Sequence, residues 1–311
     1  MTSKREKIAD INPNVVKRYN ERNVGRYDGK YYDLDTGECL PDNYKLTVEP
    51  TPEQKRRLTA YNDLAKHEIE NGGFIFAFFT RNKTALAELF PELTETERAR
   101  VVLMARFIAY ETGRLQHDNG NIIRKKNLVK ILNMSDKRFG EFFRKITSLE
   151  IITENTETGE LFMNQSVFYR GDLKAYPYKL DKDTRHARVF RQTYQDLYEK
   201  FQGRQLSKLH LIYDILPYLN LKTNILCHNP EESDTDLLRL MSVDELAEKL
   251  GYADHRKLKR AMNDVKVSGE PVFNFMENPY NRRQKRCRVN PRVIYAGGAD
   301  ALKLISAEFN A

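Results

Sequence analysis

Two stretches of the sequence carry hydrogen-bond donors at helical spacing, opposite a stripe of apolar residues. In residues 255–265 the apolar stripe consists of Leu258, Ala261, Met262 and Val265. The outer positions carry donors that could reach the edges of bases, namely Arg256, Lys259, Arg260 and Asn263. A helix that reads duplex DNA buries one side and presents such donors on the other, because Arg, Lys, Asn, Gln and Ser hydrogen-bond base edges in the major groove. A charged side that is merely solvated is the alternative for any single helix.

The same division occurs between Ser135 and Leu149. Its apolar stripe matches the other once a one-residue insertion in the preceding turn is allowed, and consists of Phe139, Phe142, Phe143, Ile146 and Leu149. Together with the short helix before it and the expected N-cap at Ser135, this stretch offers the candidate contacts Lys125, Lys126, Ser135, Lys137, Arg138, Arg144 and Lys145. Because the pattern occurs twice, DNA binding is favoured over two independent solvated faces.

Both stretches belong to longer segments that end alike, at residues 164–171 and 290–297. Four residue types coincide without a gap in these ends, in the pairs Asn164/Asn290, Val167/Val293, Tyr169/Tyr295 and Gly171/Gly297. Upstream of each end the sequence predicts a short helix, a turn, the basic helix and a two-stranded hairpin. Each segment also contains a capping box, at Thr94–Glu97 and Ser242–Glu245. This order predicts a helix-turn-helix followed by a wing, present twice in the chain.

The two predicted wings differ in charge. Residues 150–160 hold four Glu and no Lys or Arg, so phosphates should repel the first wing, which is where a protein partner is expected instead. Residues 278–292 hold six Lys or Arg and no acid, which predicts a long basic tip that lies on phosphates or enters a minor groove. The candidate contacts of this second wing are Arg282, Arg283, Lys285, Arg286 and Arg288.

The sequence around these segments predicts further regular elements. Asp28-Gly29 between tyrosines predicts a β-hairpin, and an apolar run at residues 74–79 predicts a buried strand. Helices are expected from their apolar spacing and from Pro or capping residues near their first turns. These helices cover about residues 52–70, 94–112, 183–201 and 206–219.

The expected fold class is therefore mainly α with small β wings (α+β), with two tandem winged helix-turn-helix domains and a small N-terminal hairpin and helix region. The expected division is a basic arm and β-hairpin at 1–50, a helix and apolar strand packing on the first repeat at 51–93, winged helix 1 at 94–176, a connector helix at 177–205, winged helix 2 at 206–298 and a tail at 299–311.

The composition restricts the classes of partner. The chain has 311 residues and a formal net charge of +8, which points to an anionic partner such as nucleic acid. No apolar run approaches the ~18 residues of a membrane span, and the first residues lack the apolar part of a signal peptide. The three Cys lie far apart, as expected of free thiols in a reducing cytoplasm. We expect a cytoplasmic protein that does not enter a membrane.

Patterns typical of catalysis are missing from the sequence. No phosphate-binding GxxxxGK[ST] loop occurs. The six His do not form the His-hydrophobic-His pair that rolling-circle initiators use to hold a metal, and the Cys show no metal-ligand spacing. We therefore expect no enzyme activity, no catalytic residues, no cofactor and no metal site.

The tandem segments, each ending in Asn-x-x-Val-[Phe/Ile]-Tyr-x-Gly, resemble replication initiators of plasmids and phages of Gram-positive bacteria. Residues 134–171 are similar to the MarR-like winged helix of RepL-type plasmid replication proteins. The paired arrangement is similar to initiators of iteron plasmids, whose two winged helices contact successive major grooves. The resemblance covers about residues 94–298, and the acidic first wing departs from a wing that grips phosphates.

The resemblance implies a sequence-specific protein that binds double-stranded DNA at a replication origin and recruits host replication proteins. A winged-helix transcription regulator of phage or plasmid genes is the alternative, since it would use the same DNA contacts. A third class is a protein-interaction module in which the winged helices serve as scaffolds. The sequence leaves the oligomeric state open, with a homodimer as one option.

Overall fold

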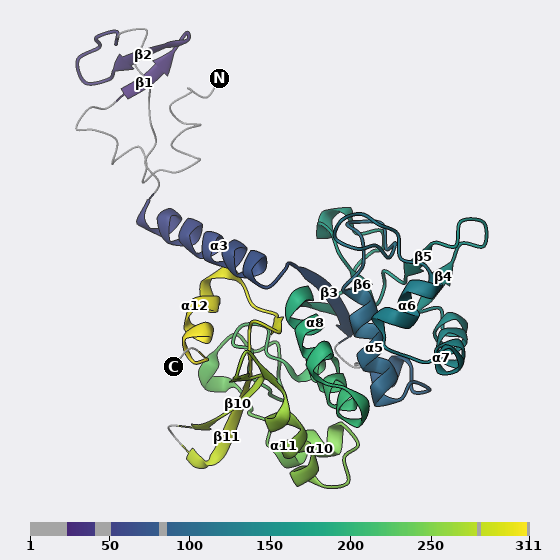
Figure 1. Cartoon of the computed structure of the whole chain (residues 1–311). Helices are drawn as coiled ribbons and strands as arrows, with labels where there is room; N and C mark the ends of the chain where they lie inside the picture. The colour runs from purple at the N-terminus through teal and green to yellow at the C-terminus, as the bar shows by residue number, and fades with distance from the viewer. Residues whose placement is uncertain (1–23, 41–50, 81–85, 279–280, 310–311) are drawn as a thin grey trace. The chain divides into compact units, whose positions relative to one another are not determined.

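The computed structural model describes residues 24–40, 51–80, 86–278 and 281–309, with the backbone alone at 86–87, 277–278 and 281–285 (Figure 1). The chain divides into two units, residues 1–62 and residues 63–311. Helices and several small sheets make up the described residues, so the prediction of an α+β protein is confirmed at this level. None of the helices in the described ranges is long and apolar enough to cross a membrane.

The first unit contains the predicted hairpin. Strands β1 (Val24–Tyr27) and β2 (Lys30–Asp33) pair antiparallel. The turn between them has positive φ at both Asp28 (45°) and Gly29 (85°), the geometry that Asp-Gly favours in a two-residue hairpin. The first 23 residues of the predicted arm, and residues 41–50, lie outside the described residues. Helix α3 (Pro52–Glu70) has the predicted bounds and runs across the division between the units.

A four-stranded antiparallel sheet lies at the centre of the second unit, in the order β12-β7-β3-β6. The long strands β3 (Phe74–Thr80) and β7 (Thr184–Phe190) pair along their whole lengths. The short strand β6 (Phe168–Tyr169) flanks β3, and β12 (Ile294–Tyr295) flanks β7. The twin ends of the repeated segments therefore occupy equivalent edges of one shared sheet, which was not expected from the sequence.

The first half of this unit follows β3 and ends in β6. Its elements are α4 (Leu86–Leu89), α5 (Glu95–Ala105), α6 (Lys125–Ile131), α7 (Asp136–Ser148), β4 (Ile152–Glu154) and β5 (Leu161–Met163). A 3-10 turn, η1 (Leu173–Ala175), leads from β6 towards β7.

The second half follows β7 and ends in β12. Its helical elements are α8 (Arg191–Lys200), η2 (Gly203–His210), α9 (Leu211–Asp214), η3 (Leu216–Tyr218), η4 (Thr235–Leu237), α10 (Val243–Lys249) and α11 (His255–Asp264). Its strands are β8 (Lys266–Val267), β9 (Glu270–Pro271), β10 (Phe273–Asn278) and β11 (Asn281–Val289), and α12 (Ala299–Ala307) closes the chain.

Three predicted helices are corrected. The expected connector helix at 183–201 is a strand up to Phe190, because those residues pair with β3, and only α8 is helical. The expected helix at 94–112 ends at Ala105, because the chain turns at residues 106–107 and Ile108 then pairs with Leu115. The helix at 206–219 is divided into η2, α9 and η3, with Pro217 inside the last.

The twin ends adopt one geometry. In each half the backbone carbonyl of the Asn accepts from the third and fourth residues after it, so that Asn164 closes on Phe168 and Asn290 on Ile294. The Tyr169 hydroxyl donates to the carbonyl of Asp172 at 3.0 Å, and the Tyr295 hydroxyl donates to that of Gly298. A Cβ at Gly171 would collide with the Tyr169 hydroxyl, and one at Gly297 would lie 2.7 Å from the Tyr295 hydroxyl, which explains why Gly follows each Tyr at this spacing.

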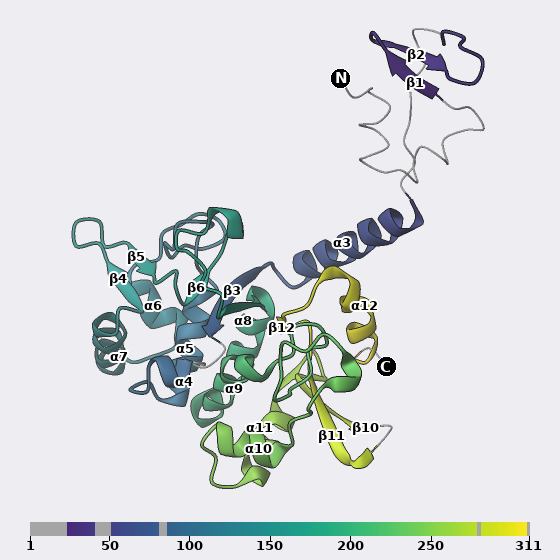
Figure 2. The same ribbon diagram turned by 180° about the vertical axis from the view of Figure 1, so that it is seen from behind.

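One hydrophobic core runs through both halves of residues 63–311. It includes Phe142 and Ile146 of α7 as well as Leu258 and Met262 of α11. A smaller cluster joins Leu64 near the end of α3 to Leu302, Ile305 and Phe309 at the C-terminal helix, where α12 lies beside α3 (Figure 2). The residues that were expected to form a connector and a tail therefore contribute to the packing of this unit.

Protonation of His186 is expected to lower stability at acidic pH. Burial lowers the pKa of His186, and the charges of Arg188 and Arg185 lower it further. The unfolded chain then binds a proton near pH 6.5 that the folded chain resists, so stability is lost as the pH falls from about 6.5 towards the folded pKa. Urea unfolding at pH 7 and pH 5 should show a smaller loss for His186→Gln than for the wild type. An identical loss in both would contradict the assignment.

Candidate nucleic-acid interface

Helices α6 and α7 form the first candidate reading element. The turn between them passes through Asn133 at a φ of 49°, and the amides of Asn133 and Met134 donate to carbonyls of α6 at 3.1 Å. Helix α7 begins after Ser135, the predicted N-cap, although the Ser135 side chain makes no capping hydrogen bond. The predicted apolar stripe is buried as far as Ile146, which turns the opposite side of the helix outward.

Helices α10 and α11 form the second candidate element. The predicted capping box is present. The Ser242 hydroxyl accepts from the amide of Glu245 at 3.2 Å, and the Glu245 carboxylate accepts from the amide of Ser242 at 2.8 Å. The turn passes through Gly251 at a φ of +73°, and Asp254 caps α11 by accepting from the amide of Arg256 at 2.8 Å. Both elements therefore reach the basic helix through a turn with one residue at positive φ, but only α11 has a side-chain cap. Helices α7 and α11 lie well apart in Figures 1 and 2.

The outward faces of the two helices can be compared position by position, because their buried residues align. The centre of the α7 face consists of Lys137, Glu141 and Arg144, and that of α11 of Arg256, Arg260 and Asn263, all of them exposed. The equivalent of Arg260 is thus an acid, Glu141. The two faces present different donors and acceptors, so they would read different bases.

Several of the predicted contacts are exposed and make no ion pair within the part of the chain that the structure describes. They are Lys125, Lys126, Lys137, Arg138, Arg144, Lys259 and Arg260. The Lys125 ammonium lies 4.5 Å from the centroid of the Phe143 ring, which fixes it beside α7. The Arg256 guanidinium lies 3.2 Å from Asp254, but its side chain is 80% exposed, so this surface pair is weak. Asn263 is exposed as predicted.

Lys145 is corrected from a DNA contact to an internal brace. Its ammonium lies 2.9 Å from both carboxylate oxygens of Glu97 in α5. Burial by itself would raise the pKa of Glu97, but hydrogen bonds from Thr94 and Lys145 outweigh it and lower the pKa. The equivalent position in α11 is Asp264, which pairs with Lys208 of η2 at 2.7 Å, so the same brace occurs in both halves with the charges exchanged.

The second wing is a hairpin of β10 and β11, paired from Phe273–Val289 out to Asn278–Asn281. The predicted long basic tip is therefore mostly strand. Arg288 is buried and pairs with Glu308 after α12, and Arg286 lies 3.8 Å from the same carboxylate. The predicted phosphate contact of Arg288 is corrected, since its guanidinium is buried against Glu308, whereas that of Arg286 stays a prediction.

The side chains of Arg282, Arg283 and Lys285, the other predicted contacts of this wing, lie outside the described residues. The role of Glu308 as the partner of Arg288 and Arg286 was not predicted from the sequence. The signal that could have identified Glu308 is that it is the one acid among residues 301–311, after a run of basic residues at 282–292 that contains no acid.

Two arginines of the first half contact the acidic first wing. Arg114 lies 3.2 Å from Glu160, and the Arg124 guanidinium donates to the carbonyl of Thr158 at 3.3 Å. Glu150, Glu154 and Glu157 are exposed. The predicted repulsion from phosphate is consistent with this surface, which leaves α6 and α7 as the basic part of the first half.

Comparison with known proteins does not extend these observations: no protein-family model, no curated protein and no solved structure matches the chain.

His210, Asp214 and the thiols of Cys227 and Cys287 are buried, whereas the thiol of Cys39 is exposed. His210 lies 2.6 Å from Asp214 and 3.0 Å from the Tyr252 hydroxyl, an arrangement that resembles a catalytic relay, but His210 and Asp214 are each only 2% exposed. Burial raises the pKa of the Cys227 thiol to about 11, which keeps it protonated. No cluster of three or more His, Cys, Asp or Glu suited to a metal occurs within the described ranges.

Proposed function

We propose that the protein binds duplex DNA through two winged helix-turn-helix elements, with α7 and α11 as the reading helices. The observation that carries the proposal is the repetition: a basic helix after a tight turn, followed by a hairpin and the same Asn-to-Gly end, occurs twice in one unit. A basic face that is merely solvated is common on a single helix. Two basic faces at equivalent positions of the two repeated segments favour a shared function in DNA binding.

The charge of the exposed side chains supports this proposal. The cations without an ion pair lie around α6, α7 and α11, where they would contact phosphates on either side of the groove that each helix enters. Two other predicted contacts, Lys145 and Arg288, have carboxylate partners and are half-buried and buried, respectively. This separation is expected of a surface that must stay available for a polyanion.

Binding should fall steeply with salt. Phosphate contacts by Lys125, Lys126, Arg138, Lys257 and Lys259 would release about five counterions, which gives a slope of about −4.5 in a plot of log affinity against log salt concentration. A duplex selected from a random pool with the full chain provides the ligand, and fluorescence anisotropy measures its affinity. An affinity that hardly changes between low and moderate salt would contradict the proposal, and failure to select or bind any duplex would favour a protein-interaction scaffold.

We propose initiation of plasmid or phage replication in the cytoplasm as the role of this binding, with the exposed acids of the first wing facing host replication proteins. A transcription regulator would use the same helices. Deleting the gene from its replicon separates the two roles, because an initiator is required for maintenance of the replicon, whereas a regulator only changes transcript levels.

A further inference from the structure

Each of the two reading helices is attached to an element that packs inside the unit. The Lys145 ammonium of α7 lies 2.9 Å from the Glu97 carboxylate of α5. Helix α11 is held at its end in the same way, because its last residue, Asp264, pairs with Lys208 of η2 at 2.7 Å. Helix α5 and η2 pack against each other. The orientation of α11 relative to α7 therefore depends on how α5 and η2 are joined.

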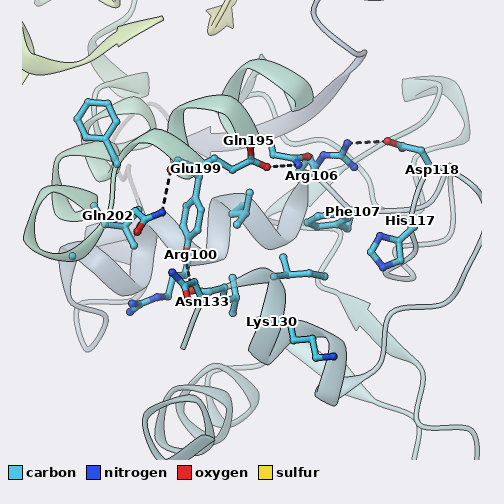
Figure 3. A pocket seen from close by; sticks show the side chains of 17 residues that line it. Arg100, Arg106, Phe107, His117, Asp118, Lys130, Asn133, Gln195, Glu199 and Gln202 are labelled. Carbon is cyan, nitrogen blue, oxygen red and sulfur yellow. Dashed lines mark hydrogen bonds and ion pairs between the residues drawn. The ribbon is translucent and has the colours of Figure 1, made fainter. Parts of the chain in front are cut away.

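Helix α8 provides a second attachment for the first reading helix. Its residues, together with those of α5 and the end of α6, line a cavity of about 530 Å³ (Figure 3). The Tyr198 hydroxyl donates to the carbonyl of Leu132, in the turn before α7, at 2.9 Å. The Tyr194 hydroxyl, one turn earlier in α8, donates to the carbonyl of Ala99 in α5 at 3.0 Å. The start of α7 is thus held, through α8, on the same helix that holds its end.

A buried network joins α5 to η2 and to the turn before α11. The Asp214 carboxylate of α9 lies 3.2 Å from the Arg98 guanidinium of α5 and 2.6 Å from Nδ1 of His210 in η2. On the other side of the ring, Nε2 of His210 lies 3.0 Å from the hydroxyl of Tyr252, and the two rings are stacked with centroids 6.2 Å apart. Tyr252 lies in the turn that leads to Asp254, the N-cap of α11. The network therefore connects the first half of the unit to the start of α11.

The burial of this network suits it to fixing an orientation. The side chains of His210 and Asp214 are each 2% exposed, and that of Arg98 is 12% exposed. Buried charged groups often add little stability compared with apolar residues of the same volume, whereas each of their hydrogen bonds requires one distance and direction. Apolar contacts are not directional, so by themselves they would allow α11 small displacements. A polar junction at its start restricts α11 to one position.

We propose that Tyr252, held by His210, is a positioning residue that keeps α11 at one orientation relative to α7. Tyr252 acts through the helix that follows it, and its hydroxyl is directed to the buried His210. The consequence for DNA rests on the proposed function: a chain whose two reading helices are held rigidly accepts only one spacing between the two segments of its DNA site.

Pulsed electron–electron double resonance on the full chain, without DNA, measures this orientation. Lys137→Cys in α7 and Lys257→Cys in α11 carry the nitroxide labels, because both residues are exposed and lie outside the network. Cys39→Ser removes the exposed native thiol, while Cys227 and Cys287 are buried and escape labelling. We expect one narrow distance distribution in this labelled parent chain.

Tyr252→Phe, which removes only the hydroxyl, should widen the distance distribution by about twofold or more, because the start of α11 loses a directional contact. Tyr176→Phe is the matched control. It also removes one hydroxyl from a half-buried ring, but the hydrogen bond that it deletes goes to the carbonyl of Gln165, outside the network. The control should leave the distribution unchanged, and circular dichroism melting shows that each variant is folded. An unchanged distribution in Tyr252→Phe would overturn the positioning role.

Fluorescence anisotropy with duplexes of altered spacing tests the consequence for DNA. One base pair added between the two segments rotates one segment about 34° relative to the other. The wild-type chain should bind this duplex at least about tenfold more weakly than the selected duplex, whereas Tyr252→Phe should lose no more than about threefold. Equal losses in both chains would overturn the link to spacing. If Tyr252→Phe widens the distance distribution but the wild-type chain binds no duplex, the positioning role stands and the proposed function is contradicted.

Discussion

Replacing Arg260 with Ala is expected to weaken binding to the selected duplex by about 1–3 kcal/mol and to relax the choice of base at one position. Arg260 lies at the centre of the outward face of α11, is exposed, and makes no ion pair within the described part of the chain. It is therefore free to form a bidentate contact with a guanine. Anisotropy with the selected duplex and with single-base variants of it measures both effects.

Lys257→Ala is the matched control for this prediction. Lys257 is exposed on the same helix but lies on its flank, the side that also carries Asp264, so its removal deletes the same charge without touching the central face. It should weaken selected and random duplexes alike. Equal losses on selected and random DNA for Arg260→Ala would show that α11 does not read bases.

The equivalent position in α7 is expected to behave differently. Glu141 stands where α11 has Arg260, and a carboxylate accepts from cytosine where a guanidinium donates to guanine. The halves of the selected site should therefore differ in sequence.

Asp214→Ala is expected to lower the free energy of unfolding by about 3–5 kcal/mol, the usual effect of leaving a buried charge without its partner. The Asp214 carboxylate is 2% exposed, lies 3.2 Å from the guanidinium of Arg98 and contacts His210. Because Arg98 belongs to α5 and Asp214 to α9, the pair joins the two halves of residues 63–311. Urea unfolding followed by circular dichroism measures the loss.

Asp264→Ala provides the comparison. It removes the acid of another ion pair, but this pair is exposed and lies within the second half. Its partner is Lys208, and the Asp264 side chain is 44% exposed, so the loss should stay within about 1 kcal/mol. If the two variants lost the same stability, the buried network would not be what holds the halves together.

Local patterns predicted the elements that position the basic side chains. The apolar stripes of α7 and α11, the capping boxes at Thr94 and Ser242, and the hairpin at Asp28-Gly29 are all set by residues close in sequence, and each is present in the structure. The twin Tyr-x-Gly ends were visible for the same reason, since the Tyr hydroxyl contacts residues only two or three positions away.

Contacts between residues far apart in the sequence were not predicted. Residues 184–190 carry an amphipathic spacing that suits a helix, but their pairing with β3, more than a hundred residues earlier, makes them a strand. Lys145 and Arg288 looked available as cations, and only the structure shows that Lys145 pairs with Glu97 and Arg288 with Glu308. A charge pattern identifies which residues are basic, but not which of them already have a partner in space.

Hydroxyl-radical footprinting on the selected duplex tests the central claim, that two helices of one chain read DNA. The account predicts two protected segments about one helical turn (~10 base pairs) apart. Protection of one segment should be lost with Lys137→Ala together with Arg144→Ala, and of the other with Arg256→Ala together with Arg260→Ala. A single protected segment that responds to only one pair of substitutions, or to neither, would contradict the account.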